Sequence, residues 1–302
     1  SLEKNVKLMF AHGIAVDDIF VQVHETETAE FSSSRVEHVE QCRRAMEWKH
    51  SVAGKLQNID GGAVTTHSVP EVIGAIVGRR KGGYYAATKE GFAELNPDNG
   101  WKVTKDFLKE DERMNDAKVD SAGRFWAGSC TMDMVPGTGA LHVLSGDLTM
   151  KTVATGITLP NGLAWSADNS HFYHVDSMQH VLTSYEVDFE NAELHNKKTL
   201  VSFPDDGSVP DGMCISDEGL LLVAMWGGSR IEIYDQQGKK QSVIDMPVKQ
   251  PSSCTFGGAK GDRLIVTSAR ASLGNTANEL DGGLFIVDGL GLTGAQSEKF
   301  NG

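Results

Sequence analysis

The stretch of sequence that decides the fold is Leu159-Pro160-Asn161-Gly162-Leu163-Ala164-Trp165. A turn follows it, and then a second apolar segment at 171–176 (HFYHVD). The same plan returns at 209–215 (VPDGMCI) and at 250–256 (QPSSCTF), each time with a second apolar segment after a short turn. Short strands that alternate apolar and polar residues between turn signals are typical of antiparallel β-sheets.

Two further copies of this plan lie earlier in the chain. One is 113–119 (RMNDAKV) followed by 125–128 (FWAG), and a looser one is 69–73 (VPEVI) followed by 84–87 (YYAA). The polar residue that begins each unit, which we call its anchor, recurs every 41 to 50 residues at Glu71, Asn115, Asn161, Asp211 and Ser252. A repeat of about 40–50 residues with about four strands predicts the blade of a β-propeller.

The length of 302 residues accommodates a sixth unit before the five visible ones. Strand-like segments occur there at 20–24 (FVQVH) and 54–59 (GKLQNI), but few apolar residues lie between them. We therefore predict an all-β, six-bladed β-propeller with four antiparallel strands per blade. Residues 1–18 form an N-terminal extension, and 19–302 form a single domain with a divergent first blade. A strand near Phe20 could complete the last blade and close the ring.

Charge and cysteine content limit the partners. The chain has 41 acidic and 28 basic residues, a net charge of −13, which disfavours nucleic acid and anionic membrane surfaces. No apolar run reaches the ~18 residues of a membrane-spanning helix. The four cysteines are far apart, with no CxxC pair, as in a reduced intracellular protein. We expect a cytoplasmic protein, a monomer or small homo-oligomer, that acts on a small molecule.

The anchors are candidate ligands for a cation. The first strand of a propeller blade lines the central channel, so Asn115, Asn161 and Asp211 are expected to converge at one end of it. Carboxylate and amide oxygens suit a hard divalent cation, and no histidine is among the anchors. Asn and Asp before Gly are also ordinary turn residues. His174 could reach the channel, or it could be a buried histidine of a blade.

Several motifs resemble one family of propellers. The stretch from Arg113 to Gly128 (RMNDAKVDSAGRFWAG) is similar to the RxNDxKxDxxGRxWxG signature of the regucalcin (senescence marker protein)/gluconolactonase/luciferin-regenerating enzyme family. The segments 160–166 (PNGLAWS) and 210–213 (PDGM) resemble its NGLxWS and PDGM motifs, and 252–258 and 282–285 resemble its last blade. The similarity extends from about residue 53 to the end of the chain.

This resemblance implies a six-bladed propeller that hydrolyses lactones with one divalent metal ion. The ion would be Ca²⁺ first, with Mg²⁺, Mn²⁺ or Zn²⁺ as alternatives, and some relatives hydrolyse organophosphates. The resemblance implies that Asn161 and Asp211 bind the metal and that Asp211 is also the general base or the nucleophile. Arg113 and Asn115 would contact the substrate, and in some members the residue matching Asn115 lies on the metal.

The chain departs from the family pattern at one metal ligand. The family has a glutamate in an early GEGPxW motif, and counting back from 52–56 (VAGKL) places that position near Ser33. Glu30, Glu37 or Glu40 could take its place only if this loop is displaced. Three alternatives remain: a neighbouring glutamate completes the site, the metal is weakly bound, or the protein has lost this chemistry.

A smaller departure follows Gly128, where some members place an acidic substrate ligand and Asp133 is the nearest candidate. The chain is therefore expected to be a lactonase-type hydrolase. The alternative is a non-catalytic or altered-site propeller that binds a small ligand or a protein partner.

Overall fold

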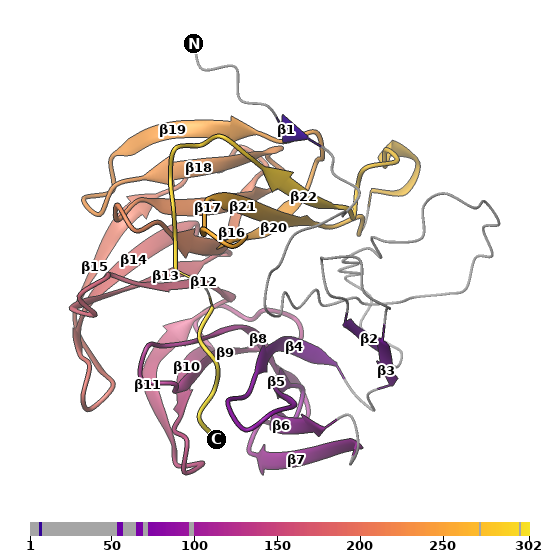
Figure 1. The fold of residues 1–302 in the computed structure, drawn as a ribbon. Helices are drawn as coiled ribbons and strands as arrows, with labels where there is room; N and C mark the ends of the chain where they lie inside the picture. The colour runs from indigo at the N-terminus through magenta and orange to yellow at the C-terminus, as the bar shows by residue number, and fades with distance from the viewer. Residues whose placement is uncertain are drawn as a thin grey trace.

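The protein folds into antiparallel β-blades arranged around an axis (Figure 1). The computed structural model describes residues 72–96, 100–271, 273–295 and 297–302, and the backbone of the strands β1 (Val6–Lys7), β2 (Ala53–Leu56) and β3 (Thr65–Ser68). These residues form five four-stranded sheets and one two-stranded sheet. The all-β propeller prediction is confirmed.

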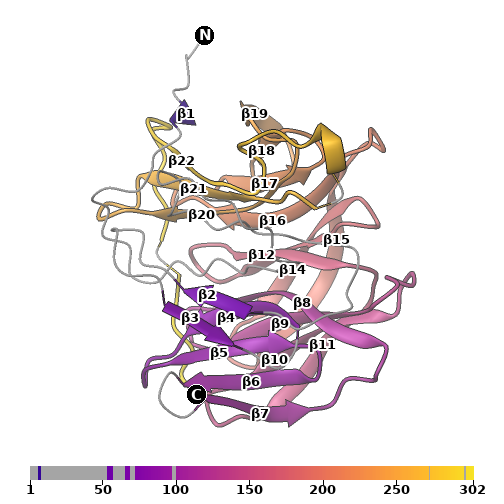
Figure 2. The same ribbon diagram turned by 90° about the vertical axis from the view of Figure 1, so that its right-hand side faces the viewer.

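Four blades have strands that follow one another in the chain. They comprise β4 (Ile73–Gly78), β5 (Tyr84–Thr88), β6 (Gly91–Asn96) and β7 (Gly100–Asp106); β8 (Glu112–Val119), β9 (Phe125–Thr131), β10 (Gly139–Leu144) and β11 (Met150–Ile157); β12 (Pro160–Trp165), β13 (His171–Asp176), β14 (Val181–Asp188) and β15 (Glu193–Ser202); and β16 (Val209–Ile215), β17 (Leu221–Trp226), β18 (Arg230–Tyr234) and β19 (Lys240–Asp245). The first strand of each blade packs against the first strand of the next. Figures 1 and 2 show the last strands, β7, β11, β15 and β19, on the outside.

The fifth blade combines both ends of the chain. It has the order β20 (Pro251–Gly257), β21 (Arg263–Ser268), β22 (Leu284–Val287) and β1, with Val6 paired to Val287 and Lys7 to Ile286. β1 comes from within the predicted N-terminal extension, whereas the expected strand near Phe20 lies outside the described residues. The boundary between extension and domain stays a prediction.

The prediction of six four-stranded blades is wrong. Where the sixth was expected, over about residues 20–68, the structure describes only the hairpin β2–β3. A blade must bury apolar side chains on both faces, against a neighbour on each side. The predicted first blade has few apolar residues in its middle, so it lacks the side chains that four strands need for this packing.

The hydrophobic core lies between neighbouring blades. One cluster joins the blades of β4–β7 and β8–β11 through Tyr85, Phe92 and Phe125, and another joins β8–β11 to β12–β15 through Trp126 and Phe172. Two more clusters join β12–β15 to β16–β19 and the latter to β20–β22. In the described part of the chain the one helix is the three-residue 3-10 turn Gly274–Thr276, and no helix there is long and apolar enough to cross a membrane.

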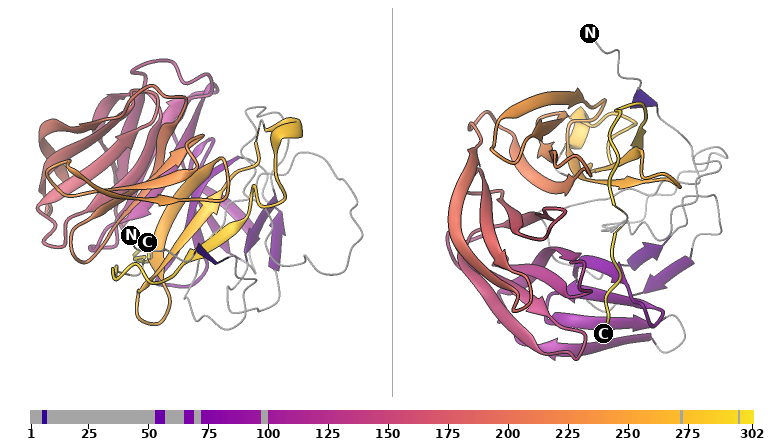
Figure 3. Two further views of the ribbon diagram at one scale, coloured as in Figure 1. Left: turned by 90° about the horizontal axis from the view of Figure 1, so that it is seen from above. Right: turned by 60° about the vertical axis from the view of Figure 1, so that its left-hand side comes forward.

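The C-terminal segment crosses from the fifth blade back to the first two (Figure 3). The backbone N–H of Phe300 donates to Gly78 O at 2.9 Å, and that of Asn301 donates to Gly123 O at 3.0 Å. The Phe300 ring is fully buried and lies 4.7 Å from the Tyr85 ring, centroid to centroid. This segment therefore ties the end of the chain to the start of the propeller.

Candidate active site on the inner strands

The five inner strands, β4, β8, β12, β16 and β20, share a local irregularity. Each has one residue more than its partner strand near its start, which is a β-bulge. The register shifts lie between Ile73 and Ala75, Met114 and Ala117, Asn161 and Leu163, Pro210 and Met213, and Pro251 and Ser253. Bulges redirect side chains and are frequent next to active sites.

Four of the predicted anchors occupy these bulges: Asn115, Asn161, Asp211 and Ser252. In the first described blade the bulge is at Gly74, and the expected anchor Glu71 lies outside the described residues. The repeat recognised in the sequence is therefore a repeat of bulged inner strands, with a polar side chain on four of them.

The glycines after two anchors permit close contact between inner strands. A Cβ atom on Gly162 would lie 2.9 Å from the backbone oxygen of Asp211, and one on Gly212 would lie 2.2 Å from Ser253 Oγ. Both glycines are within strands, and neither has a positive φ. The Asn-Gly and Asp-Gly pairs are thus not turns here, because each glycine lets the neighbouring strand approach.

Buried hydrogen bonds join three of the predicted site residues. An Nη atom of Arg113 donates to Asn115 Oδ1 at 2.6 Å, and Asn115 Nδ2 donates to Asn161 Oδ1 at 2.7 Å. Asn115 Nδ2 also contacts Pro160 O at 2.7 Å, and Asn161 Nδ2 donates to Ser177 Oγ at 2.7 Å. The structure therefore brings Arg113, Asn115 and Asn161 together, and all three are at least 96% buried.

Asp211 lies on the next inner strand, adjacent to that of Asn161. Asp211 is 2% exposed, and its backbone oxygen lies close to Gly162, on the side where a Cβ atom would be. A carboxylate this deeply buried needs polar or cationic partners. Among the anchors in the bulges, Asp211 is the one that is acidic, whereas Asp116, which follows Asn115 in the β8 bulge, is only partly buried.

The donor types of this cluster fit a hard cation, although few of them are acidic. Asn161 and Asp211 supply an amide oxygen and a carboxylate, the ligand types of Ca²⁺ and Mg²⁺. Asn115 Oδ1 accepts a hydrogen bond from the Arg113 guanidinium, and Asn161 Oδ1 accepts one from Asn115, so either oxygen would contact a metal ion in addition to its present donor. Metal binding by Asn115 stays a prediction. Over the ranges that the structure describes, no three His, Cys, Asp or Glu side chains group to hold a metal ion.

The other predicted site residues are not part of this buried cluster. Asp133 is exposed on the loop between β9 and β10, and its predicted contact with substrate stays a prediction. The first-blade candidates Ser33, Glu30, Glu37 and Glu40 lie outside the described residues. His174 is buried in β13 with 2% exposure, and burial lowers its pKa to about 3, so it is a neutral histidine of the blade.

Sequence reasoning missed two residues at the end of β13. Ser177 accepts the hydrogen bond from Asn161, and the Asp176 carboxylate accepts hydrogen bonds from the backbone N–H of Thr158 (2.8 Å) and Leu159 (3.0 Å). Asp176 thereby fixes the turn that leads into Asn161. Asp176 pairs with Pro160 at the start of β12, and Ser177 follows it in the chain. Their position within the repeat is therefore the signal that could have identified them.

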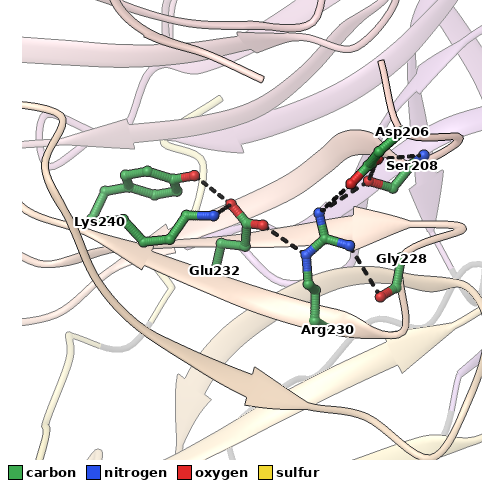
Figure 4. A network of polar contacts seen from close by, with 7 residues as sticks. Asp206, Ser208, Gly228, Arg230, Glu232 and Lys240 are labelled. Atoms are coloured by element: carbon green, nitrogen blue, oxygen red, sulfur yellow. Dashed lines mark hydrogen bonds and ion pairs between the residues drawn. The ribbon is translucent and has the colours of Figure 1, made fainter. Parts of the chain in front are cut away.

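Arg230 was also missed, and it holds the loop that precedes Asp211 (Figure 4). Its guanidinium donates to Asp206 Oδ2 at 3.1 Å, Ser208 Oγ at 3.2 Å and Gly228 O at 3.3 Å. On its other side, Arg230 Nε donates to Glu232 Oε1 at 2.6 Å. The loop that enters β16 is therefore fixed to the third strand of the same blade.

The carboxylates of this network remain ionised. Burial would raise the pKa of Glu232, but hydrogen bonds from Lys240, Tyr234 and Arg230 outweigh burial and lower it. Hydrogen bonds from the Ser208 side chain and backbone, with the Arg230 charge, lower the pKa of Asp206 to about 2. At neutral pH the network therefore stays charged and continues to hold the loop in place.

The fold and this cluster define a class of protein: a β-propeller whose bulged inner strands bring buried polar residues together at one end. The family model described as "SMP-30/Gluconolactonase/LRE-like region" matches residues 44–270. The chain therefore belongs to the SMP-30/gluconolactonase/luciferin-regenerating-enzyme-like family, a family that includes gluconolactonases.

Individual relatives agree with this assignment. The chain is 34% identical to regucalcin of Danio rerio, over 79% of this chain and 84% of that protein, and 32% identical to regucalcin of Homo sapiens, over 76% and 81%. Among solved structures, a luciferin-regenerating enzyme superposes with a TM-score of 0.76 at 26% identity, covering 82% of this chain and 88% of that one. The predicted family resemblance is confirmed.

Proposed function

We propose that the protein is a divalent-metal-dependent hydrolase of lactones. The observation that carries this proposal is the buried hydrogen-bonded set Arg113–Asn115–Asn161, with the buried Asp211 on the inner strand next to that of Asn161. It combines a fixed cation and amide groups, which can stabilise the charge that develops on a carbonyl oxygen, with a carboxylate that can take a proton from water. Membership of a family that includes gluconolactonases supports the choice of lactones.

Each residue has a role in this reaction. Asp211 is the general base that takes a proton from the attacking water, or the nucleophile that attacks the carbonyl carbon itself. Arg113, held by Asn115, donates hydrogen bonds to the substrate oxygen that gains negative charge. Asn161 and Asp211 would hold the metal ion, which supplies Lewis acidity at the carbonyl when bound. Ca²⁺ is the first choice, and Mg²⁺, Mn²⁺ or Zn²⁺ are alternatives.

The remaining parts of the proposal concern substrate range and setting. Organophosphate esters are a second possible substrate class, because the same groups would stabilise negative charge on a phosphoryl oxygen. Three described cysteines, Cys130, Cys214 and Cys254, are buried thiols that form no disulfide among the described residues, which supports a reducing cytoplasmic setting. The net charge of −13 supports a small-molecule partner rather than nucleic acid, and we propose a monomer or small homo-oligomer.

A second candidate function has its own support. With one fully buried carboxylate, that of Asp211, among the anchors and no trio of His, Cys, Asp or Glu over the described ranges, the site would bind a cation weakly. The alternative is a propeller that binds a small ligand or a protein partner through the same cluster without hydrolysing it.

Metal removal and replacement separates these two functions. The purified protein is assayed for δ-valerolactone hydrolysis before EDTA treatment, after it, and after addition of Ca²⁺, Mg²⁺, Mn²⁺ or Zn²⁺. The proposal predicts that EDTA abolishes hydrolysis and that at least one ion restores it. If no ion gives turnover while the lactone still binds, the non-catalytic function is the correct one.

A further inference from the structure

The loops at the anchor end of the propeller expose two apolar side chains. Over the ranges that the structure describes, two large hydrophobic residues are exposed, Val135 and Met178, each at 46%. Exposed apolar residues that gather at a polar site are typical of ligand-binding surfaces. Their positions relative to the candidate site therefore decide whether they have such a role.

Both residues lie on loops at the same end of the molecule. Val135 is on the β9–β10 loop and Met178 is in the β13–β14 turn. These two segments meet at Thr158, whose Oγ1 accepts hydrogen bonds from the Gly137 N–H (3.1 Å) and from Gln179 Nε2 (3.4 Å). Val135 and Met178 thus flank a shared hydrogen-bonded contact.

The bases of these loops touch the candidate site. Ser177, directly before Met178, accepts the hydrogen bond from Asn161 Nδ2 at 2.7 Å. The strand that leads to Val135 pairs with β8, and its Cys130 lies opposite Arg113. Both exposed apolar side chains therefore lie on loops whose bases are bonded to, or paired with, residues of the polar cluster.

The loops are held in place. The Val135 N–H donates to Thr131 Oγ1 at 2.8 Å, the Thr138 hydroxyl donates to Val135 O at 2.8 Å, and the His180 N–H donates to Ser177 O at 3.1 Å. Because the loops are ordered before a ligand arrives, little entropy is lost when one binds.

We propose that the substrate carries an apolar chain on its lactone ring and that this chain lies over Val135 and Met178, which we call the apolar rim. This inference rests on the proposed function for the position of the ring at Arg113 and Asp211. The polar cluster would hold the ester group, and the rim would cover the chain. The substrate class is then alkyl-substituted lactones rather than polyhydroxylated ones.

The test compares two lactones on three proteins. δ-Valerolactone has no chain, and δ-dodecanolactone carries a heptyl chain on the same ring. A fully buried methylene favours binding about fourfold, so a chain on a half-exposed rim should raise kcat/KM roughly ten- to hundredfold. The Val135→Ser/Met178→Ser double variant should reduce this ratio about tenfold, and the apolar control Val135→Ile/Met178→Leu should keep it. An unchanged ratio in the serine variant overturns the proposal.

A binding measurement separates failure of this inference from failure of the proposed function. If the parent hydrolyses neither lactone, the proposed function is contradicted, and the Kd of both lactones is measured by calorimetry. Tighter binding of δ-dodecanolactone that is lost in the serine variant supports the apolar rim without any turnover. Equal Kd values for the two lactones, or for parent and serine variant, contradict it.

Discussion

Asn161 forms hydrogen bonds with two neighbouring side chains, and it is also a proposed metal ligand. Its Oδ1 accepts from Asn115 and its Nδ2 donates to Ser177, both at 2.7 Å. The sequence identified Asn161 as an anchor through its place in the repeat. Ser177 was missed because its contact with Asn161 depends on the register between β12 and β13, which its position within the repeat indicates only indirectly.

Two replacements of Asn161, one neutral and one negatively charged, should change the affinity for a cation in opposite directions. Asn161→Ala removes an oxygen ligand and is expected to weaken Ca²⁺ or Mg²⁺ binding about tenfold or more. Asn161→Asp keeps an oxygen and adds a negative charge beside Asp211, so it should strengthen binding. Calorimetric titration of the metal-free proteins measures both effects.

The free energy of unfolding provides the control for these variants. Loss of two buried hydrogen bonds in metal-free Asn161→Ala should cost about 1–3 kcal/mol. If the alanine variant unfolds altogether, or if the aspartate variant binds the ion no better than alanine, Asn161 is structural rather than a ligand.

At the scale of elements, the loop that enters β16 depends on a residue from β18. Arg230 connects this loop, through Asp206 and Ser208, to the buried Glu232. Asp211 could be predicted from the repeat, whereas the residue that positions its loop could not. Arg230 is 19 positions later in the chain, and only the packing of the blade brings the two segments together.

Removing the Arg230 guanidinium should lower kcat/KM of the proposed reaction and have a smaller effect on the melting temperature. Arg230→Gln releases the Asp206–Ser208 loop, so kcat/KM should fall about tenfold. Arg263→Gln is a matched control, because it breaks the Arg263–Asp288 ion pair (3.2 Å) of the fifth blade. The control should keep the parental kcat/KM. The melting temperatures of both variants are measured alongside. If Arg230→Gln keeps the parental kcat/KM, the position of the loop does not depend on Arg230.

At the scale of the whole molecule, five blades could be predicted from the sequence and the sixth could not. The five have repeated strands with clear alternation, such as 160–165 and 209–215. The predicted first blade was inferred from chain length rather than from its own apolar pattern, and the structure describes only β2–β3 there. Ring geometry also depends on long-range pairing, as in β1 with β22 and Phe300 with Gly78, for which local sequence has no signal.

The stability of the whole molecule should fall in acid because of two buried histidines. Burial lowers the pKa of His174 to about 3 and that of His142 to about 4, against about 6.5 when unfolded. Below pH 6.5 the unfolded chain binds protons that the folded chain does not, so their stabilisation is complete above pH 6.5 and declines toward pH 4. The expected slope is about 1.4 kcal/mol per pH unit for each histidine.

Urea unfolding between pH 7 and pH 4 measures this slope. His174→Gln should reduce it by about 1.4 kcal/mol per pH unit. His195→Gln, which changes an exposed side chain, should leave it as in the parent. An unaltered slope in His174→Gln would mean that His174 is protonated in the folded protein.

The most direct test of the central claim is the rate of δ-valerolactone hydrolysis by Asp211→Asn, with the restoring metal ion present. Asp205→Asn, which makes the same charge change at an exposed position of the preceding loop, is the control. Loss of the base or nucleophile should lower kcat by roughly 10²–10⁴-fold, with the control close to the parent. If Asp211→Asn retains kcat within a few fold of the parent, Asp211 does not carry the reaction.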